Sequence, residues 1–185
     1  MIAQTEYTKA RAKLIIEQPF FGTLCMRLRP KESTDISTGA TDGVSLIYNP
    51  NWFLKLNQWE RVGFLAHEVM HCVYLHMLRK QSRQHSKWNI ACDYAINPIL
   101  KEAGFNLPQG GLLKEEYYDM SAEHIYSILP TPPEGWPDTT DPGGCGGVLD
   151  HPNAAKGEPT PMQETEWTVA ISSALNEAKN RGKLY

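Results

Sequence analysis

The chain has 185 residues, a formal net charge of -3 and a pI near 6.1. This length suits one domain with its own hydrophobic core, so we expect a single domain over residues 1–185. The charge gives no broad basic footprint, and we expect no nucleic-acid partner. The four cysteines form no C-x-x-C pair, which argues against a structural zinc ribbon and a disulfide framework.

The sequence also predicts where the protein acts. Its N-terminal residues lack the charged-then-apolar pattern of a signal peptide. The longest apolar run, 62–78, contains three histidines and a glutamate, so it does not suit a membrane span. We therefore expect a cytoplasmic protein that does not contact a membrane.

The N-terminal part is predicted to hold a helix and two strands. Residues 3–17 are apolar on one side and charged on the other, and Pro19 ends this helical pattern. The aromatic and apolar stretch 20–28 predicts a strand, the polar stretch 30–42 a loop, and 44–48 a second strand.

Start signals mark the next two helices. Asn49 and Pro50 suit the cap and first position of a short helix. Asn57 with Glu60 resembles a capping box, so a long helix is expected to begin there. We expect this helix to end near 79–80, where an arginine and a lysine suit the negative end of the helix dipole.

The remaining chain is predicted to be mostly helical. Ser86 could cap a helix over 87–103, in which Pro98 predicts a kink or break near Asn97. Further helices are expected at 121–129 and 163–180. Between them, residues 130–161 hold eight prolines and six glycines, which predicts a long irregular segment. The fold class is therefore α+β, mostly helical, with a small sheet of two to four strands packed on the helix that begins near Asn57.

That long helix contains the motif His67-Glu68-Val69-Met70-His71, or H-E-x-x-H. Two histidines four residues apart lie on one face of a helix and can bind one metal ion, while Glu68 is rotated by about 100°. In zinc hydrolases this arrangement holds Zn²⁺ and uses the glutamate as general base. Burying these side chains is costly unless a metal ion satisfies them. The alternative is a buried histidine pair bonded to the backbone.

A third ligand is expected from the following helix, because catalytic zinc usually has three protein ligands. Asn89, Asp93 and Asn97 form a polar stripe on an otherwise apolar helix. We predict Asp93 as the ligand, with Asn97 or Asn89 orienting a histidine or the carboxylate. Alternatively, this stripe forms a polar network between helices or faces solvent.

The other histidines are weaker candidates. On a continuous helix His76 points about 140° away from His71, so it reaches the same metal only if the helix ends and turns. No glycine or proline between them favours such a turn, and we expect His76 to pack or to support a ligand. His124 and His151 rank lower still, and His85 is expected at the surface.

Four stretches together show a known family pattern. They are Leu65-Ala66-His67-Glu68-Val69-Met70-His71 followed by His76 and Arg79; Trp88-Asn89-Ile90-Ala91-Cys92-Asp93-Tyr94-Ala95-Ile96-Asn97; Met120-Ser121-Ala122-Glu123-His124-Ile125-Tyr126; and Asp141-Pro142-Gly143-Gly144-Cys145-Gly146. From about residue 8 onward, the chain resembles the metallopeptidase domain found N-terminal to von Willebrand A-like domains in bacterial proteins. The resemblance implies a zincin-like fold, a zinc ion held by His67, His71 and Asp93, and peptidase activity with Glu68 as base.

The chain departs from longer members of that family. It ends at Tyr185, which leaves no room for a von Willebrand-like domain. The AAA+ ATPase partner suggested for longer relatives is therefore a weaker expectation, and a compact stand-alone version or an excised domain fits the sequence better.

The expected activity is that of a zinc-dependent endopeptidase acting on a protein or peptide substrate. We expect the substrate to lie along a sheet edge, with the strand at 44–48 as that edge. Tyr48, Tyr94 and His124 are candidates for stabilising the oxyanion. Two alternatives remain: a non-catalytic, metal-stabilised interaction module, and a zinc hydrolase of a non-peptide substrate such as RNA. In its glycine-rich stretch, Cys145 could close the zinc site as a latency switch or could be a free cysteine.

Overall fold

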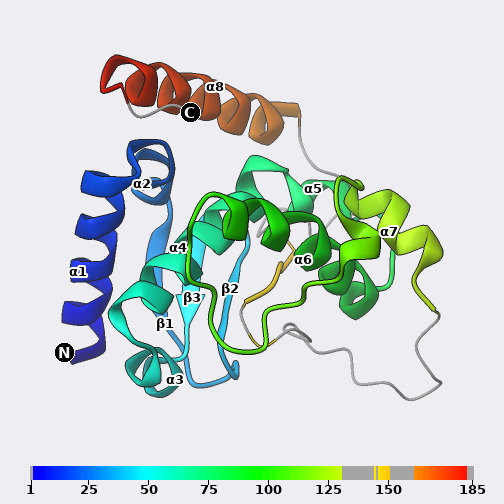
Figure 1. The fold of residues 1–185 in the computed structure, drawn as a ribbon, viewed down its shortest axis with the longest axis horizontal. Coiled ribbons are helices and arrows are strands. Elements are labelled where there is room, and N and C mark those ends of the chain that lie inside the picture. Colours follow the sequence, from blue (N-terminus) through cyan, green and yellow to red (C-terminus); the bar gives the residue numbers. More distant parts are fainter. Residues whose placement is uncertain (1, 131–143, 145, 151–160, 183–185) are drawn as a thin grey trace.

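A three-stranded sheet and eight helices make up the part of the chain that the computed structural model describes, which is residues 2–130, 144, 146–150 and 161–182 (Figure 1). The helices are α1 (Ile2–Glu17), α2 (Pro19–Cys25), α3 (Pro50–Lys55), α4 (Gln58–Val73), α5 (His76–Arg79), α6 (His85–Glu102), α7 (Ala122–Ile128) and α8 (Pro161–Asn180), and a 3-10 turn lies at Glu115–Tyr117. The strands are β1 (Arg29–Glu32), β2 (Gly39–Thr41) and β3 (Ser45–Tyr48). The α+β class is therefore confirmed.

The sheet has the order β1-β3-β2, with β1 parallel and β2 antiparallel to β3. The strand predicted at 44–48 is confirmed, but β3 is the central strand and cannot be the edge on which a substrate lies. The loop prediction for 30–42 is wrong in part, because β1 and β2 both form there. Their hydrogen bonds to β3 outweigh the polar composition of these short strands.

The strand predicted at 20–28 is wrong, because a helix, α2, begins at Pro19. Proline fixes φ near the helical value, so the residue that ends α1 also starts the next helix. Gly22 lets α2 pack closely on α1, since a Cβ there would come within 2.4 Å of Cα of Ile15. A short apolar run does not distinguish a buried helix from a buried strand.

The motif helix, α4, begins as the sequence predicts. The side chain of Asn57 accepts hydrogen bonds from the amides of Trp59 and Glu60, and the carboxylate of Glu60 accepts one from the amide of Asn57. Pro50 likewise follows the predicted cap Asn49 in α3. Both start signals are therefore confirmed.

The end of α4 differs from the prediction. The helix stops at Val73, and Leu75 adopts a left-handed conformation with φ of 55° before α5 begins at His76. The expectation of one helix up to 79–80 is therefore wrong. The reversal places α5 beside the C-terminal end of α4, where Trp88 of α6 donates to the carbonyl of His76 (3.0 Å).

The second long helix, α6, is confirmed in its extent but not in its details. It starts at His85 after Gln84, so Ser86 is not its cap but lies buried within it. The helix continues through Pro98 to Glu102, so the alternative of a break near Asn97 is wrong. The predicted helices at 121–129 and 163–180 correspond to α7 and α8.

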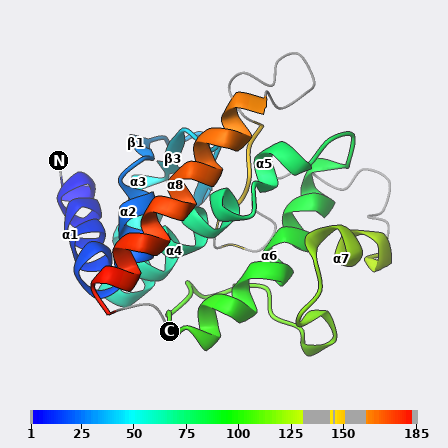
Figure 2. The same ribbon diagram turned by 90° about the horizontal axis from the view of Figure 1, so that it is seen from above.

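The hydrophobic core surrounds α4, which lies between α1 and α6 (Figure 2). Its side chains from Val62 to Cys72 are all buried, including those of the motif. The helix α8 packs on α2 and also contacts α4. Among the described helices, none has the length and apolar character needed to cross a membrane.

Replacing Asn57 with alanine should lower the free energy of unfolding by about 1 kcal/mol, because two amides at the start of α4 lose their acceptor. Chemical denaturation measures this loss. The neighbouring exposed Gln58→Ala is the control and should change stability little. Equal losses in the two variants would contradict the importance of the cap.

Candidate metal centre

Three potential metal ligands meet between α4 and α6. Nε2 of His67 lies 2.9 Å from Nε2 of His71, and these two atoms lie 3.5 and 3.4 Å from Oδ1 of Asp93. All three side chains are fully buried. The structure therefore brings together the three predicted ligands, which we call the metal triad. Their role as ligands stays a prediction.

The surroundings of His67 set its tautomer. The amide nitrogen of Asn97 donates to the carbonyl of Leu112 (3.0 Å), so its oxygen faces Nδ1 of His67 at 2.9 Å. That oxygen can only accept, which places the hydrogen of His67 on Nδ1. The lone pair on Nε2 then points toward Asp93. Asn97 thus holds His67 in the form that binds a metal, as the sequence suggested.

His76 holds the other histidine of the triad. Its Nδ1 lies 3.0 Å from Nδ1 of His71, on the side of the ring opposite to the triad. When Nε2 of His71 binds a metal, Nδ1 carries the hydrogen and donates it to His76. The helix turn that was not expected from the sequence does occur, at Leu75, and it brings His76 to His71 but not to the shared centre.

Charge and burial set the protonation states in the centre. Burial, and secondarily the neighbouring His67, lowers the pKa of His71 to about 4, so its imidazole is neutral at pH 7. Burial alone would raise the pKa of Asp93, but in the metal-free protein attraction to His67 and hydrogen bonding with both histidines, which apply when their Nε2 atoms carry a hydrogen, hold it below its usual value. A neutral imidazole and an ionised carboxylate are the forms that bind metal ions.

The donor set fits zinc. Ligand atoms 2.0–2.1 Å from a tetrahedral ion are about 3.3 Å apart, and the three distances within the triad are 2.9, 3.4 and 3.5 Å. Two lone pairs and a carboxylate that face one another repel unless a proton or a cation lies between them. The triad can therefore hold a divalent ion with a two-histidine, one-carboxylate set.

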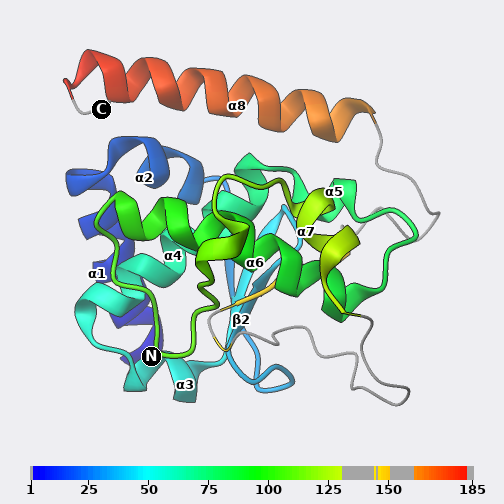
Figure 3. The same cartoon turned by 45° about the vertical axis from the view of Figure 1, so that its right-hand side comes forward.

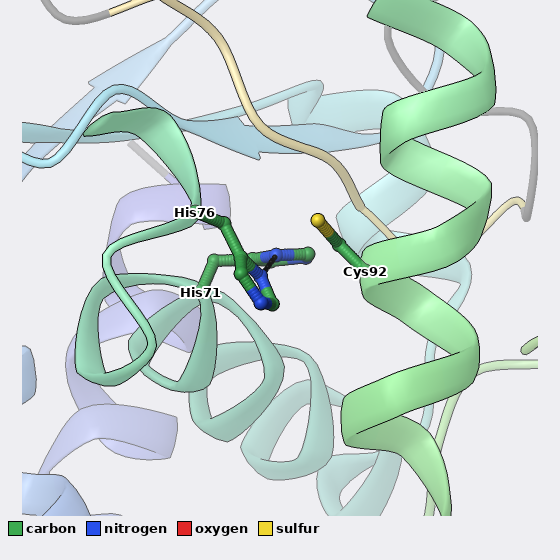
Figure 4. Close-up of side chains that lie close together, drawn as sticks. All are labelled: His71, His76 and Cys92. Carbon is green, nitrogen blue, oxygen red and sulfur yellow. Dashed lines mark hydrogen bonds between the residues drawn. The ribbon is translucent and has the colours of Figure 1, made fainter. Parts of the chain in front are cut away.

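A second group, His71, His76 and Cys92, also has the composition of a metal site (Figure 4). Burial raises the pKa of Cys92 well above its usual value, so its sulfur is a neutral thiol. The two Nδ1 atoms already share one hydrogen, and His71 cannot bind a metal through Nδ1 without losing it. The triad is therefore the better candidate for a metal site, and His76 is the better candidate for supporting His71.

Glu68 lies next to the triad, with its side chain fully buried. The backbone of Gly146 covers it, because a Cβ on Gly146 would come within 1.9 Å of Oε1 of Glu68 and 3.1 Å of Cδ2 of His67. The φ of 139° at Gly146 also suits glycine. The general base predicted from the motif thus faces a polypeptide backbone.

The remaining candidates lie elsewhere or outside the described residues. The hydroxyl of Tyr48 donates to Glu32 (3.0 Å), the ring of Tyr94 packs edge-on against Tyr117, and His124 is exposed on α7. None of these contacts involves the triad. His85 is half-buried at the start of α6 and contacts Asn89. Cys145 and His151 fall outside the described residues.

Sequence reasoning missed the role of Asn89. The sequence predicts that Asn97 or Asn89 orients a histidine of the motif or the carboxylate, and Asn97 is the one that contacts His67. The side-chain amide of Asn89 instead donates to the carbonyl of Val148 and accepts its N–H, both at 3.3 Å. The polar stripe on α6 indicates that Asn89, Asp93 and Asn97 each have a buried polar role. Nothing in the spacing indicated which of the three side chains would hold a distant segment.

Replacing Asn97 with leucine should lower zinc affinity about 10- to 100-fold, because His67 loses the acceptor that orients it. Competition with a chromophoric chelator measures the affinity. Asn97→Asp keeps an acceptor and should retain most of it. The exposed Asn51→Leu is the control, and equal affinity in Asn97→Leu and Asn51→Leu would contradict the assignment.

The metal-free protein should lose stability as the pH falls. His71 stays neutral in the folded state down to about pH 4 but takes up a proton in the unfolded state below about 6.5. Protons therefore favour unfolding across this window, by up to roughly 3 kcal/mol at its lower end. Urea denaturation at pH 7 and 4.5 should show a weaker pH dependence for His71→Gln than for the control His124→Gln. Equal dependence would contradict this account.

Comparison with known proteins places these residues in a family. An uncharacterized protein of Thermotoga maritima is 36% identical over 120 residues, which cover 60% of this chain and 30% of that relative. No solved structure matches the chain. The profile of the family described as "Putative metallopeptidase domain" matches residues 3–185. Because that match covers nearly the whole sequence, the chain belongs to this metallopeptidase-domain family.

Proposed function

We propose that the protein is a zinc-dependent metallopeptidase that hydrolyses peptide bonds. The observation that supports this proposal is the meeting of three buried side chains that could hold a metal ion, beside a buried glutamate. Membership in the family also supports the proposal, since the family is described as a metallopeptidase domain. His67, His71 and Asp93 would hold the ion, which leaves a fourth tetrahedral position for the reaction.

Zinc, when bound, supplies Lewis acidity, which makes water a nucleophile at neutral pH and polarises a carbonyl group. Asn97 and His76 keep both histidines in the tautomer that binds through Nε2. The ionised carboxylate of Asp93 balances part of the charge of the ion. Together these residues fix the centre before a substrate arrives, which is how preorganised sites lower a barrier.

Glu68 would act as general base and then as general acid. Its carboxylate oxygen takes the proton of the attacking water and passes it to the nitrogen of the leaving amine. The residue follows His67 directly on α4, so it borders the centre without being one of the three ligands. Because its side chain is fully buried, a charge on its carboxylate is little screened and acts strongly on a nearby proton.

A peptide substrate fits the space beside Glu68. The structure has a polypeptide backbone at that place, the backbone of Gly146, with no side chain between it and the carboxylate. Because the backbone of Gly146 can lie against Glu68, the backbone of a substrate, with the amide bond to be cleaved, can lie there as well. An AAA+ ATPase partner and a cytoplasmic location stay predictions from the sequence.

Zinc loading and Glu68→Gln test the proposal together. The purified protein should bind one zinc ion, and cleavage of casein or a fluorogenic peptide library should require it. Glu68→Gln should bind zinc but lose at least about 100-fold in kcat/KM, because the water loses its base. The exposed Glu164→Gln is the matched control.

Retained activity in Glu68→Gln would refute the assigned base. A protein that binds zinc tightly and cleaves none of these substrates would instead favour the non-catalytic module. X-ray absorption of the zinc-loaded protein separates the two further, since a module closed by a fourth protein ligand lacks an exchangeable position.

A further inference from the structure

Residues 146–149 form an extended segment along the outer edge of β2 (Figure 3). Thr41 donates its amide to the carbonyl of Gly147 (2.9 Å) and accepts the amide of Leu149 (2.8 Å), which makes a parallel pairing between Thr41 and Val148. We call residues 146–149 the covering segment. It pairs with this edge of the three-stranded sheet through that single bridge, and β2 also contacts α4.

The opposite side of the covering segment is held by α6. The amide group of Asn89 donates to the carbonyl of Val148 and accepts its N–H, both at 3.3 Å. The side chain of Val148 is 1% exposed and belongs to the main core cluster. The main chain of Thr41 on one side, the side chain of Asn89 on the other and the burial of Val148 thus hold the covering segment.

These contacts have the features of peptide recognition by strand addition. In that mode, an extended peptide pairs with a sheet edge through its main chain, and pockets select its side chains. Gly146 lies against Glu68, the catalytic base of the proposed function. The covering segment therefore occupies the place where a scissile peptide has to lie.

We propose that the outer edge of β2 and Asn89 form the substrate groove, and that the covering segment is an internal competitor that occupies it. This inference rests on the proposed metallopeptidase function. The groove selects an extended peptide that has a glycine against Glu68 and an aliphatic side chain two residues later, in the pocket of Val148. A substrate gains access by replacing the covering segment, so the resting protein has low activity.

The groove is expected to select the peptide side chains at two positions, those of Gly146 and Val148. Any Cβ at the place of Gly146 would meet the carboxylate of Glu68 within 1.9 Å, so a larger residue binds only if that carboxylate or the peptide moves. The pocket of Val148 is enclosed in the core, and a charged side chain there would be buried without a partner. The bonds to Thr41 and Asn89 involve only main-chain groups of the peptide and do not depend on its sequence.

Peptide binding tests the groove without relying on hydrolysis. The probe is a fluorescein-labelled peptide with the sequence of residues 144–150 and serine for cysteine, Gly-Ser-Gly-Gly-Val-Leu-Asp. Val148→Asp should expel the covering segment, because it would bury a charge. This variant should bind the probe at least about tenfold more tightly than the wild type, whose groove is occupied. Fluorescence anisotropy measures both affinities.

Matched variants distinguish displacement of the covering segment from a general loss of protein stability. Val169→Asp introduces the same change at a position on α8 that is 59% exposed, and should bind the probe as weakly as the wild type. Leu149→Pro removes the N–H that is donated to Thr41 without burying a charge, and it should release the groove if Val148→Asp does not fold. Adding Asn89→Leu to either released variant should abolish binding, as should aspartate in place of valine in the probe.

The outcomes distinguish this inference from the proposed function. If the released variants bind the probe and cleave fluorogenic peptides about tenfold faster than the wild type, both stand. Probe binding without cleavage by any variant supports the groove and contradicts the peptidase. Cleavage by the wild type, with released variants that neither bind the probe nor cleave faster, overturns the covering segment as a competitor and leaves the peptidase intact.

Discussion

The mutual repulsion of three buried acceptor atoms is the constraint on which the rest of the site depends. Nε2 of His67, Nε2 of His71 and Oδ1 of Asp93 face one another within 3.5 Å and away from solvent. Such a group is costly to bury unless a cation compensates it. The packing of α4 against α6 therefore creates a centre whose repulsion a proton or a cation has to compensate. Metal binding should contribute to the stability of this interface as well as to chemistry.

The histidines depend on residues behind them, and the fold accepts local strain to supply one of these. Leu75 adopts a left-handed backbone conformation that costs a non-glycine residue about 1 kcal/mol or more. In return, α4 stops and His76 comes back against Nδ1 of His71. Had the helix continued, His76 would point away and His71 would need another acceptor. The strain is thus located where it orients a ligand.

The sequence predicted the parts of the site that depend on local spacing. The capping box at Asn57, the helical face shared by His67 and His71, and the polar stripe containing Asp93 all follow from 3.6-residue periodicity and cap chemistry. It did not predict β1 and β2, which exist only because β3 lies between them. Nor could it predict the turn at Leu75 or the covering segment, since both result from contacts between residues distant in sequence or from a rare backbone conformation.

Burial gives the centre its strength and also limits access to it. The predicted base and the three predicted ligands, all removed from water, act on each other with little screening, yet the proposed hydrolase has to admit a substrate and water. Glycine at position 146 reconciles these demands, because a bare backbone can lie against Glu68 where a side chain could not. The covering segment is held mainly by hydrogen bonds at an edge, which a second peptide backbone can reproduce one for one. Replacing the backbone of the covering segment with that of a substrate therefore changes the number of hydrogen bonds little. The free-energy difference between the covered and the substrate-bound groove then depends on the side chains at the positions of Gly146 and Val148.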